Sequence, residues 1–277
     1  EIRLEPSAAD KLVPVSEFVR FHDESKHDRL YEDEIHATSM WEAGISMPDL
    51  QGTALSVKRR LADCRLYHFH DTSTGSPLKK TAHVNDNRHL RHDGSNLAAF
   101  LHLLREEHEH AYRTIVATVR QVAPFFQDFA LEPELEKPDT ILLRWDHKGT
   151  DAYFDASSLS DGTLRLMALA TVLLQPMEYR PSVMMLDEPE LGLHPYAITL
   201  LASLMKKAST DTQVIVATQS SLLLDHFEPE EVLVANRVDR ATRFTRLDPA
   251  GLKSWLEDYS LGQLWEKNEI GGRPAPE

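Results

Sequence analysis

The sequence predicts an α/β fold with a mostly parallel sheet flanked by helices. Two apolar segments, 183–186 and 212–217, are followed by polar or strand-breaking residues, as is typical of buried strands in parallel sheets. Residues 196–208, which lie between them, have the length and pattern of a helix. A strand, a helix and a second strand in this order form a right-handed crossover unit. We therefore expect both segments to be fully buried neighbours in one parallel sheet.

Two adjacent carboxylates, Asp187 and Glu188, follow the first segment directly, and Pro189 ends the strand there. Open α/β sheets bind their ligands at the carboxyl ends of the strands. In phosphoryl-transfer enzymes with this arrangement, the first carboxylate holds Mg²⁺ and the second orients or deprotonates an attacking water. The alternative is a turn at the strand end whose acids are merely solvated.

The segment 157–174 precedes this strand and predicts a helix with an accessible amino terminus. Ser160 is a strong N-cap residue, Gly162 permits another backbone to approach closely, and no helix breaker follows Thr163 before Pro176. A helix start that presents free N–H groups beside a hydroxyl is suited to binding phosphate. The alternative is an ordinary capped helix without a ligand.

The second predicted strand runs into a polar cluster formed by Thr218, Gln219 and Ser220. Neighbouring parallel strands bring their carboxyl ends to the same edge of a sheet. We therefore expect this cluster to lie beside Asp187 and Glu188.

Together these motifs resemble the ABC-type ATPase heads of the RecF/SMC-like class, and the chain looks most similar to bacterial AAA-family ATPases described as RecF-like. The similarity covers most of the chain, including residues 65–73, 93–101 and 259–274. The resemblance implies a P-loop NTPase fold, ABC-ATPase-like, in which a helical lobe carries the signature motif. It also implies ATP and Mg²⁺ as cofactors.

The same resemblance implies roles for individual residues. Asp187 would be the Mg²⁺ ligand and Glu188 the catalytic base. Gln219 would belong to the switch segment, where many ABC heads carry His; glutamine can form a hydrogen bond there but cannot take up a proton at neutral pH. The residues expected to contact ATP held by a second subunit are those of the signature loop, together with the end of the interface loop 190–194: Ser160, Asp161, Gly162, Thr163 and His194.

The largest departure from this class is an absence. ATP binding there depends on the pattern G-x-x-x-x-G-K-[ST], and none of the 11 glycines lies in such a pattern. The chain begins with Glu1 and not with Met, and residues 1–5 look like a strand entered part-way through a domain. We therefore expect the carboxyl-terminal part of an ATPase head, with the phosphate-binding loop upstream. Natural loss of that loop is the alternative.

Composition favours a cytoplasmic protein that does not enter a membrane. The 277 residues, 42% of them hydrophobic, can bury a substantial core. The single cysteine, Cys64, cannot form an internal disulfide, and no apolar run reaches the length of about 18 residues that a membrane span needs. The net charge of −14 disfavours DNA binding, because the surface repels phosphate on average. Short basic groups such as 58–60 are interpreted as solvated faces, although a DNA contact on one face of a dimer stays open.

The chain is expected to form one head with three consecutive parts. These are 1–90, the remainder of the nucleotide-binding lobe with a polar insertion; 91–155, a helical segment and a β-hairpin; and 156–277, the signature helix, the Walker B strand and the remaining βα units. Further elements are predicted from local patterns. They are a helix from 97 capped by Ser95 or Asn96, a helix over 109–122, a hairpin over 140–154, strands over 232–236 and 243–247, and a helix over 252–259.

The 14 histidines suggest two arrangements with metal-ligand spacing. They are His68 with His70 on a strand face, and His102 with Glu106 and His110 on a helix face. No cysteine pair supports either, so chance spacing is the preferred interpretation. The resemblance adds a second role for His70 and Asp71, because the loop that joins the two lobes of ABC heads contacts Mg²⁺ and the attacking water. Arg165, near the start of the signature helix, is expected to be structural.

The function expected is that of an ATP-hydrolysing head that forms a dimer, or a higher oligomer, around ATP. Some related ATPases carry a nuclease domain after the head, but only about 40 residues follow 236 here, fewer than a typical domain needs. Any nuclease or toxin activity would therefore come from a separate effector chain, which would suit DNA repair or phage defence. The alternative is a non-hydrolysing scaffold or regulatory subunit that senses nucleotide.

Overall fold

The computed structural model describes residues 2–6, 12–21, 31–35, 43–238 and 241–272. The chain forms two compact units, an amino-terminal unit, Glu1–Arg65, and a carboxyl-terminal unit, Leu66–Glu277. The division into three parts made from the sequence stays a prediction beside this result.

The amino-terminal unit contains an antiparallel sheet in the order β1-β2-β3, followed by helix α1. The strand expected at the start of the chain is confirmed as β1. A buried carboxylate joins the sheet to the next turn, since Glu17 accepts hydrogen bonds from the backbone N–H groups of Gly44 (2.5 Å) and Ile45 (3.1 Å). The elements are β1 (Ile2–Pro6), β2 (Leu12–Phe21), β3 (Tyr31–Glu34), η1 (Gly44–Ser46) and α1 (Gly52–Ala62).

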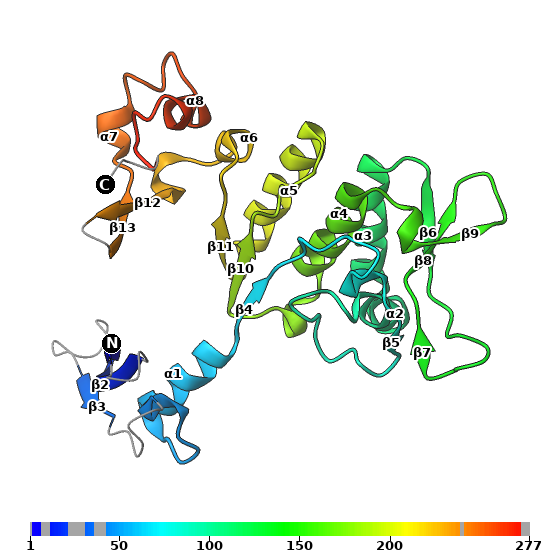
Figure 1. Cartoon of the computed structure of the whole chain (residues 1–277), viewed down its shortest axis with the longest axis horizontal. Coiled ribbons are helices and arrows are strands. Elements are labelled where there is room, and N and C mark those ends of the chain that lie inside the picture. Colours follow the sequence, from blue (N-terminus) through cyan, green and yellow to red (C-terminus); the bar gives the residue numbers. More distant parts are fainter. Residues whose placement is uncertain (1, 7–11, 22–30, 36–42, 239–240, 273–277) are drawn as a thin grey trace. The chain divides into compact units, whose positions relative to one another are not determined.

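The sheet that bears the predicted motifs has the strand order β11-β10-β4 (Figure 1). Strands β10 and β11 are parallel, with Asp187 opposite Ala217, and α5 connects them. The predicted strand–helix–strand order is therefore confirmed, and the carboxyl ends of the two strands lie side by side. The bounds are β4 (Cys64–Tyr67), β10 (Val183–Asp187), α5 (Pro195–Ala208) and β11 (Gln213–Ala217).

The expectation that both strands are fully buried is wrong. In β10 the side chains alternate, with Met184 and Leu186 buried and their neighbours partly exposed. In β11 Ile215 is 47% exposed. The reason is that side chains alternate between the two faces of a sheet: Met184 and Leu186 face the core, and the described residues leave the other face partly open.

The core of the carboxyl-terminal unit is centred on α4, which packs against α3 and α5 (Figure 1). All residues from 164 to 174 of α4 are buried, as expected for a helix that is apolar on every side. The predicted cap is confirmed, since the Thr163 backbone N–H donates to Ser160 Oγ at 3.2 Å. The α-helices of this unit that precede β10 are α2 (Leu97–Glu107), α3 (Glu109–Val122) and α4 (Asp161–Leu174).

The prediction that the side chain of Ser95 or Asn96 caps α2 is wrong. Asn96 occupies the N-cap position, but its side chain makes no cap hydrogen bond. The buried amide instead donates to the carbonyls of Asp86 and His89, each at 2.8 Å, and accepts from the Arg91 N–H at 2.8 Å. This side chain therefore organises the preceding loop, which satisfies a fully buried amide better than one cap contact would.

Short antiparallel sheets and 3-10 turns lie before, between and after helices α2 to α4. The predicted hairpin is confirmed in part, because β8 and β9 pair as expected, whereas β7 pairs with β5 and so buries Ile141. The elements are η2 (Pro77–Lys79), β5 (Ala82–His83), β6 (Phe126–Ala130), β7 (Thr140–Ile141), β8 (Arg144–His147), β9 (Tyr153–Asp155), η3 (Ala156–Ser158) and η4 (Met177–Tyr179).

After β11 the chain forms a small antiparallel sheet and short helices. The two late strands are confirmed, but the helix predicted over 252–259 is wrong. Asp248 caps an earlier turn by accepting from the Ala250 N–H at 3.1 Å, and a second helix begins only after Ser260. The elements are α6 (Ser221–Leu224), η5 (Pro229–Glu231), β12 (Leu233–Val238), β13 (Ala241–Arg246), α7 (Pro249–Leu252) and α8 (Leu261–Glu266).

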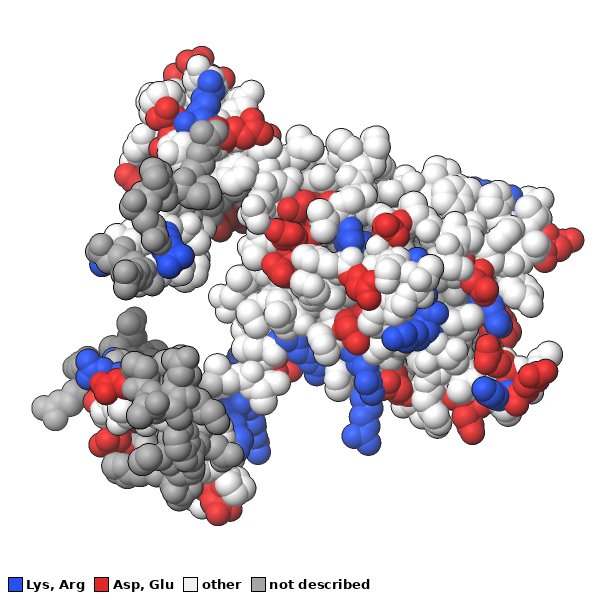
Figure 2. Space-filling view, viewed as in Figure 1, with Lys and Arg blue, Asp and Glu red and all other residues white. Residues whose placement is uncertain are grey.

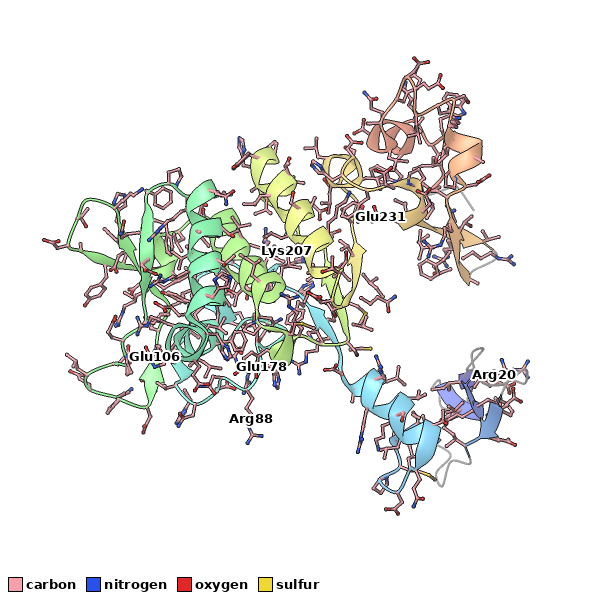
Figure 3. The ribbon with its side chains drawn as sticks, turned by 180° about the vertical axis from the view of Figure 1, so that it is seen from behind. Arg20, Arg88, Glu106, Glu178, Lys207 and Glu231 are labelled. Carbon is pink, nitrogen blue, oxygen red and sulfur yellow. The ribbon has the colours of Figure 1, made fainter. Side chains whose placement is uncertain are left out.

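Charge placement on the helices follows ordinary electrostatics. Lys206 and Lys207 stand in the last turn of α5, where cations interact favourably with the helix dipole (Figure 3). Glu178 of η4 forms an ion pair at 3.2 Å with His108, the residue that separates α2 from α3.

Among the described helices, none combines the length and apolar character needed to cross a lipid bilayer.

Candidate functional site

The predicted carboxylates lie at the end of the central strand. Asp187 is the last residue of β10, and Glu188 follows with a φ of 38°, in the left-handed region that non-glycine residues avoid. Such a conformation costs on the order of 1–3 kcal/mol and is concentrated at functional sites. The Glu188 N–H donates to the Ala217 carbonyl at 2.8 Å, which holds the turn against the end of β11.

Polar side chains from other segments contact these acids. His68 Nδ1 donates to Asp187 Oδ2 at 3.1 Å, and Gln219 Nε2 donates to Glu188 Oε1 at 2.9 Å. Thr218 Oγ1 donates to Glu190 Oε1 at 2.5 Å. The polar cluster after β11 therefore does lie beside the acids, as expected. Within the described part of the chain, Glu190 Oε2 is buried and has no hydrogen-bond partner.

Arg165 fixes the backbone around this group. Its guanidinium is buried and donates to the carbonyls of Phe69 (3.0 Å), His70 (3.1 Å) and Leu191. Burial lowers the pKa of Arg165 from its ordinary value, and the negative charge of Asp161 opposes this shift. Arg165 thus connects α4 to the segment after β4 and to the loop after β10, which is the structural role expected for it.

The predicted signature corner, Ser160 to Thr163, is accessible at its first two residues. Ser160 and Asp161 are exposed, and Thr163 Oγ1 lies 2.8 Å from Ser160 Oγ. Gly162 packs so closely against the loop after β10 that an added Cβ would overlap the Gly192 carbonyl oxygen. The close approach predicted for Gly162 is therefore present, and its partner is a loop of the same chain.

His194 has a local role that its spacing did not reveal. It is the N-cap of α5, and its Nδ1 accepts from the Tyr196 N–H at 3.3 Å. Its side chain is also exposed, beside the exposed Leu191 and Gly192. The loop from Glu190 to His194 is thus tied down at both ends and accessible between them.

The two residues of the predicted interlobe loop differ in their placement. His70 joins the site, because its Nε2 donates to the Asp187 carbonyl at 3.0 Å. Asp71 forms a local turn instead, accepting from the Ser73 N–H at 3.0 Å. Hydrogen bonds from the side chain and backbone of Ser73 lower the pKa of Asp71. His68, which the sequence paired with His70 by spacing, also contacts Asp187, and this contact could not be foreseen because 119 positions separate the two residues.

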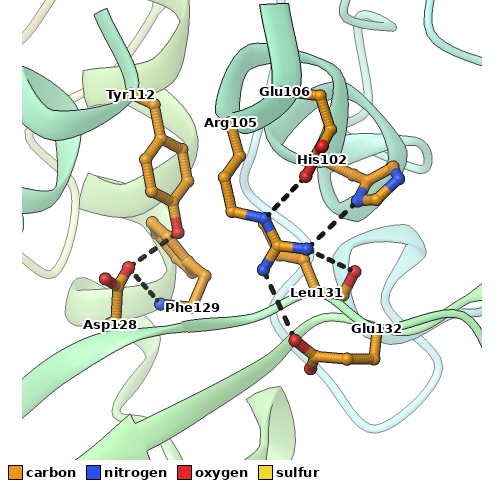
Figure 4. Close-up of polar contacts among 8 residues, drawn as sticks. All are labelled: His102, Arg105, Glu106, Tyr112, Asp128, Phe129, Leu131 and Glu132. Carbon is orange, nitrogen blue, oxygen red and sulfur yellow. Dashed lines mark hydrogen bonds and ion pairs between the residues drawn. The ribbon is translucent and has the colours of Figure 1, made fainter. Parts of the chain in front are cut away.

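The second histidine arrangement, His102 with Glu106 and His110, is not a helix face, so that expectation is wrong. His108 ends α2, and His110 belongs to the next helix. His102 Nδ1 lies 3.4 Å from an Arg105 nitrogen, and Arg105 also contacts Glu106 (Figure 4). The cation of Arg105 lies beside His102 Nδ1, where its charge would repel a metal ion bound to that nitrogen.

The basic groups considered for DNA binding have local partners. Lys79 Nζ donates to the Thr72 carbonyl at 2.6 Å, and Arg91 pairs with Asp86 at 2.9 Å. In the amino-terminal unit, Lys58 Nζ donates to the carbonyls of Ser46 and Met47. On the face of the carboxyl-terminal unit drawn in Figure 2, basic and acidic side chains are interleaved. These contacts agree with the interpretation of solvated or locally paired charges.

The residues present fit some parts of an ATP·Mg²⁺ site. The Asp187 carboxylate is 39% exposed and offers the hard oxygen that Mg²⁺ prefers, and the start of α4 offers N–H groups beside a hydroxyl. The sequence contains no Gly-Lys-Ser/Thr loop to enclose a triphosphate. These residues can therefore supply metal, water and γ-phosphate contacts.

Residues 20–225 match the family described as "AAA domain, putative AbiEii toxin, Type IV TA system". No curated protein is significantly similar to the chain.

Several solved SMC structures are similar to the chain. One, described as "Structural biochemistry of ATP-driven dimerization and DNA stimulated activation of SMC ATPases", is 18% identical with a TM-score of 0.43, over 57% of this chain and 96% of that one. The SmcHead bound to the C-winged helix domain of ScpA is 16% identical with a TM-score of 0.44, over 58% of this chain and 48% of that one. The SMC head domain from Thermotoga maritima is 12% identical with a TM-score of 0.42, over 88% and 72%. Because the family match covers more than half of the chain, the chain belongs to this family of AAA domains, and its fold is that of a P-loop ATPase domain.

Proposed function

We propose that this chain is a catalytic ATPase head that binds ATP and Mg²⁺ and dimerises around them. The observation that supports this most strongly is Glu188, which is held in a costly backbone conformation directly after Asp187. Two adjacent carboxylates at a strand end suit a reaction in which one acid holds a metal ion and the other acts on water.

The residues divide the chemistry between them. Asp187 provides the oxygen that would hold Mg²⁺, and a bound Mg²⁺ supplies neutralisation of phosphate charge. Glu188 accepts a proton from the attacking water, and Gln219 orients the Glu188 carboxylate through its amide N–H, 2.9 Å away. Gln219 does not act as a base itself, because an amide does not take up a proton at neutral pH.

The dimer is part of the same proposal. Ser160, Asp161, Gly162 and Thr163 of one copy contact the γ-phosphate bound to the other, and His194 lies in the loop that crosses between the copies. The exposure of Ser160, Asp161 and His194 supports this assignment, since an interface residue must be accessible in the free head.

The family description, which names a putative toxin and a toxin–antitoxin system, supports a proposal about partner and setting. We infer that the head acts with a separate effector, such as a nuclease or toxin, in phage defence or DNA repair. The net charge of −14 argues against extensive contact with DNA.

The test is turnover by the Glu188→Gln variant. We expect phosphate release to fall by about 10²- to 10⁴-fold, the usual contribution of a general base, while ATP affinity changes little. Glu178→Gln is the matched control, because Glu178 is an exposed carboxylate paired with His108. Equal phosphate release by Glu188→Gln and the wild type would reject the assignment.

A second candidate function is a head that senses nucleotide without hydrolysing it. The observation that favours it is Gln219 beside Glu188, because an amide at this position cannot take up a proton at neutral pH. ATP binding without phosphate release by the wild type would select this function, because the catalytic proposal requires both.

A further inference from the structure

Two imidazole rings stand next to the Asp187 carboxylate. The ring centroids of His68 and His70 are 3.8 Å apart, with an angle of 40° between the planes. One ligand atom from each of His68, His70 and Asp187 lies within 4.8 Å of the others. Among the residues that the structure describes, this is the one group of three potential metal ligands with such spacing.

The placement of the two histidines is fixed by contacts outside the group. Phe69, between them, is 4% exposed and anchors the segment in the core. The carbonyls of Phe69 and His70 both accept from the buried Arg165 guanidinium, and the His68 N–H donates to the His92 carbonyl at 2.9 Å. The imidazoles are therefore held beside Asp187 by the fold, and ligand atoms that are already positioned favour metal binding.

The distances suit a single ion after a small rearrangement. Zinc and similar ions bind imidazole nitrogen and carboxylate oxygen at about 2.0–2.2 Å, which places two ligands of one ion roughly 3 to 3.5 Å apart. His68 Nδ1 and Asp187 Oδ2 are already 3.1 Å apart. Their side chains are 47% and 39% exposed, so an ion can enter and water can occupy its remaining positions.

The ligand chemistry decides which ion fits best. Mg²⁺ prefers oxygen ligands alone, whereas imidazole suits zinc, cobalt and related ions. We propose that His68, His70 and Asp187 bind one divalent transition-metal ion, which this site prefers to Mg²⁺. The inference rests on the proposed function only in that Asp187 is a metal ligand in both, and it concerns the chain without nucleotide.

The experiment is a metal titration of the nucleotide-free chain. Co²⁺ is the probe, followed by its visible absorption, and calorimetry with Zn²⁺ and with Mg²⁺ gives the order of affinity. We expect one Co²⁺ ion per chain and tighter binding of Zn²⁺ than of Mg²⁺. His68→Gln and His70→Gln should each weaken Co²⁺ binding by at least about 10-fold, the scale on which even supporting contacts affect metal sites.

His102→Gln is the matched control, because this histidine lies on α2 next to Arg105 and should leave Co²⁺ affinity unchanged. Circular dichroism of each variant checks that the fold is retained. Unchanged Co²⁺ binding in folded His68→Gln and His70→Gln, or equal affinity for Zn²⁺ and Mg²⁺, would overturn the proposal. Failure of the ATPase proposal would show in a different measurement. In that case the wild type would release no phosphate, and the Co²⁺ titration would still give the result described here.

Discussion

Acidic side chains gather at two places in the carboxyl-terminal unit, at the end of β10 and across the β6–β8 pair. At the end of β10, Asp187, Glu188 and Glu190 each accept from a side chain of another segment. Across β6 and β8, Asp128 stands directly opposite Asp146. Asp128 accepts from the Tyr112 hydroxyl at 2.6 Å and from the Phe129 N–H at 2.8 Å (Figure 4).

The difference lies in what surrounds each carboxylate. The acids after β10 accept hydrogen bonds from neighbouring side chains, and a strained turn holds them in place. This arrangement stabilises negatively charged carboxylates. Asp146 instead has a raised pKa, because of its burial and then of the negative charges of Glu132 and Asp128. Donors alone do not separate the two regions, because Asp128 also accepts two hydrogen bonds. The strained backbone at Glu188 distinguishes the acids after β10, and the raised pKa of Asp146 distinguishes the second region.

The largest effect is expected from removing the donor that holds the first region together. Arg165→Met would leave the carbonyls of Phe69, His70 and Leu191 without their shared partner. We expect the free energy of unfolding to fall by about 3 kcal/mol or more, as for other buried charged donors. Urea denaturation measures it. Arg113→Met, which removes only an exposed ion pair with Glu109, should cost less than about 1 kcal/mol, and equal losses would refute the special role of Arg165.

A smaller effect is expected at one acid of the same region. Thr218→Val would leave Glu190 Oε1 without its donor and the Ser220 N–H without its acceptor. The expected loss is about 1–3 kcal/mol, measured as a shift in the denaturation midpoint. Thr218→Ser keeps the hydroxyl and should retain most of the stability. Equal denaturation midpoints for Thr218→Val and Thr218→Ser would show that this hydrogen bond does not stabilise the region.

The smallest effect, with the opposite sign, is expected in the second region. Because the folded pKa of Asp146 is raised, its contribution to stability is full below the unfolded pKa and is lost as pH rises through the folded value. Asp146→Asn should therefore stabilise the fold at neutral pH by a few tenths of a kcal/mol, on the scale of cross-strand charge pairs. The gain should disappear below the ordinary pKa of Asp, about 3.9. Thermal unfolding at several pH values measures it, and a loss of stability at neutral pH would contradict the repulsion.

The local sequence pattern predicted helices and strands well where residues a few positions apart determine the structure. The bounds of α3 and the cap of α4 follow from residue type, because Ser160 and the uninterrupted apolar run act within a few positions. The helix predicted over 252–259 failed because Asp248 and Pro249 start an earlier turn. The predicted burial of β11 failed for another reason, since the segments that cover each face of a sheet are distant in the sequence.

The candidate site was predictable only in part. The acids and the polar cluster after β11 follow from two strand ends, so their proximity could be expected. The contact of His68 with Asp187 spans 119 positions, and the carbonyls bound by Arg165 belong to segments before and after α4. No local pattern encodes such pairs, because they depend on how the helices pack. The roles proposed for Ser160, Asp161, Gly162, Thr163 and His194 stay predictions.

The close packing of Gly162 against Gly192 couples two surfaces mechanically. The accessible corner at the start of α4 and the accessible loop after β10 touch through two residues without side chains, with the Arg165 guanidinium beside Gly192. Neither segment can shift toward the other without a backbone clash. The start of α4 and the loop that follows Glu188 therefore hold one another in place through backbone contact.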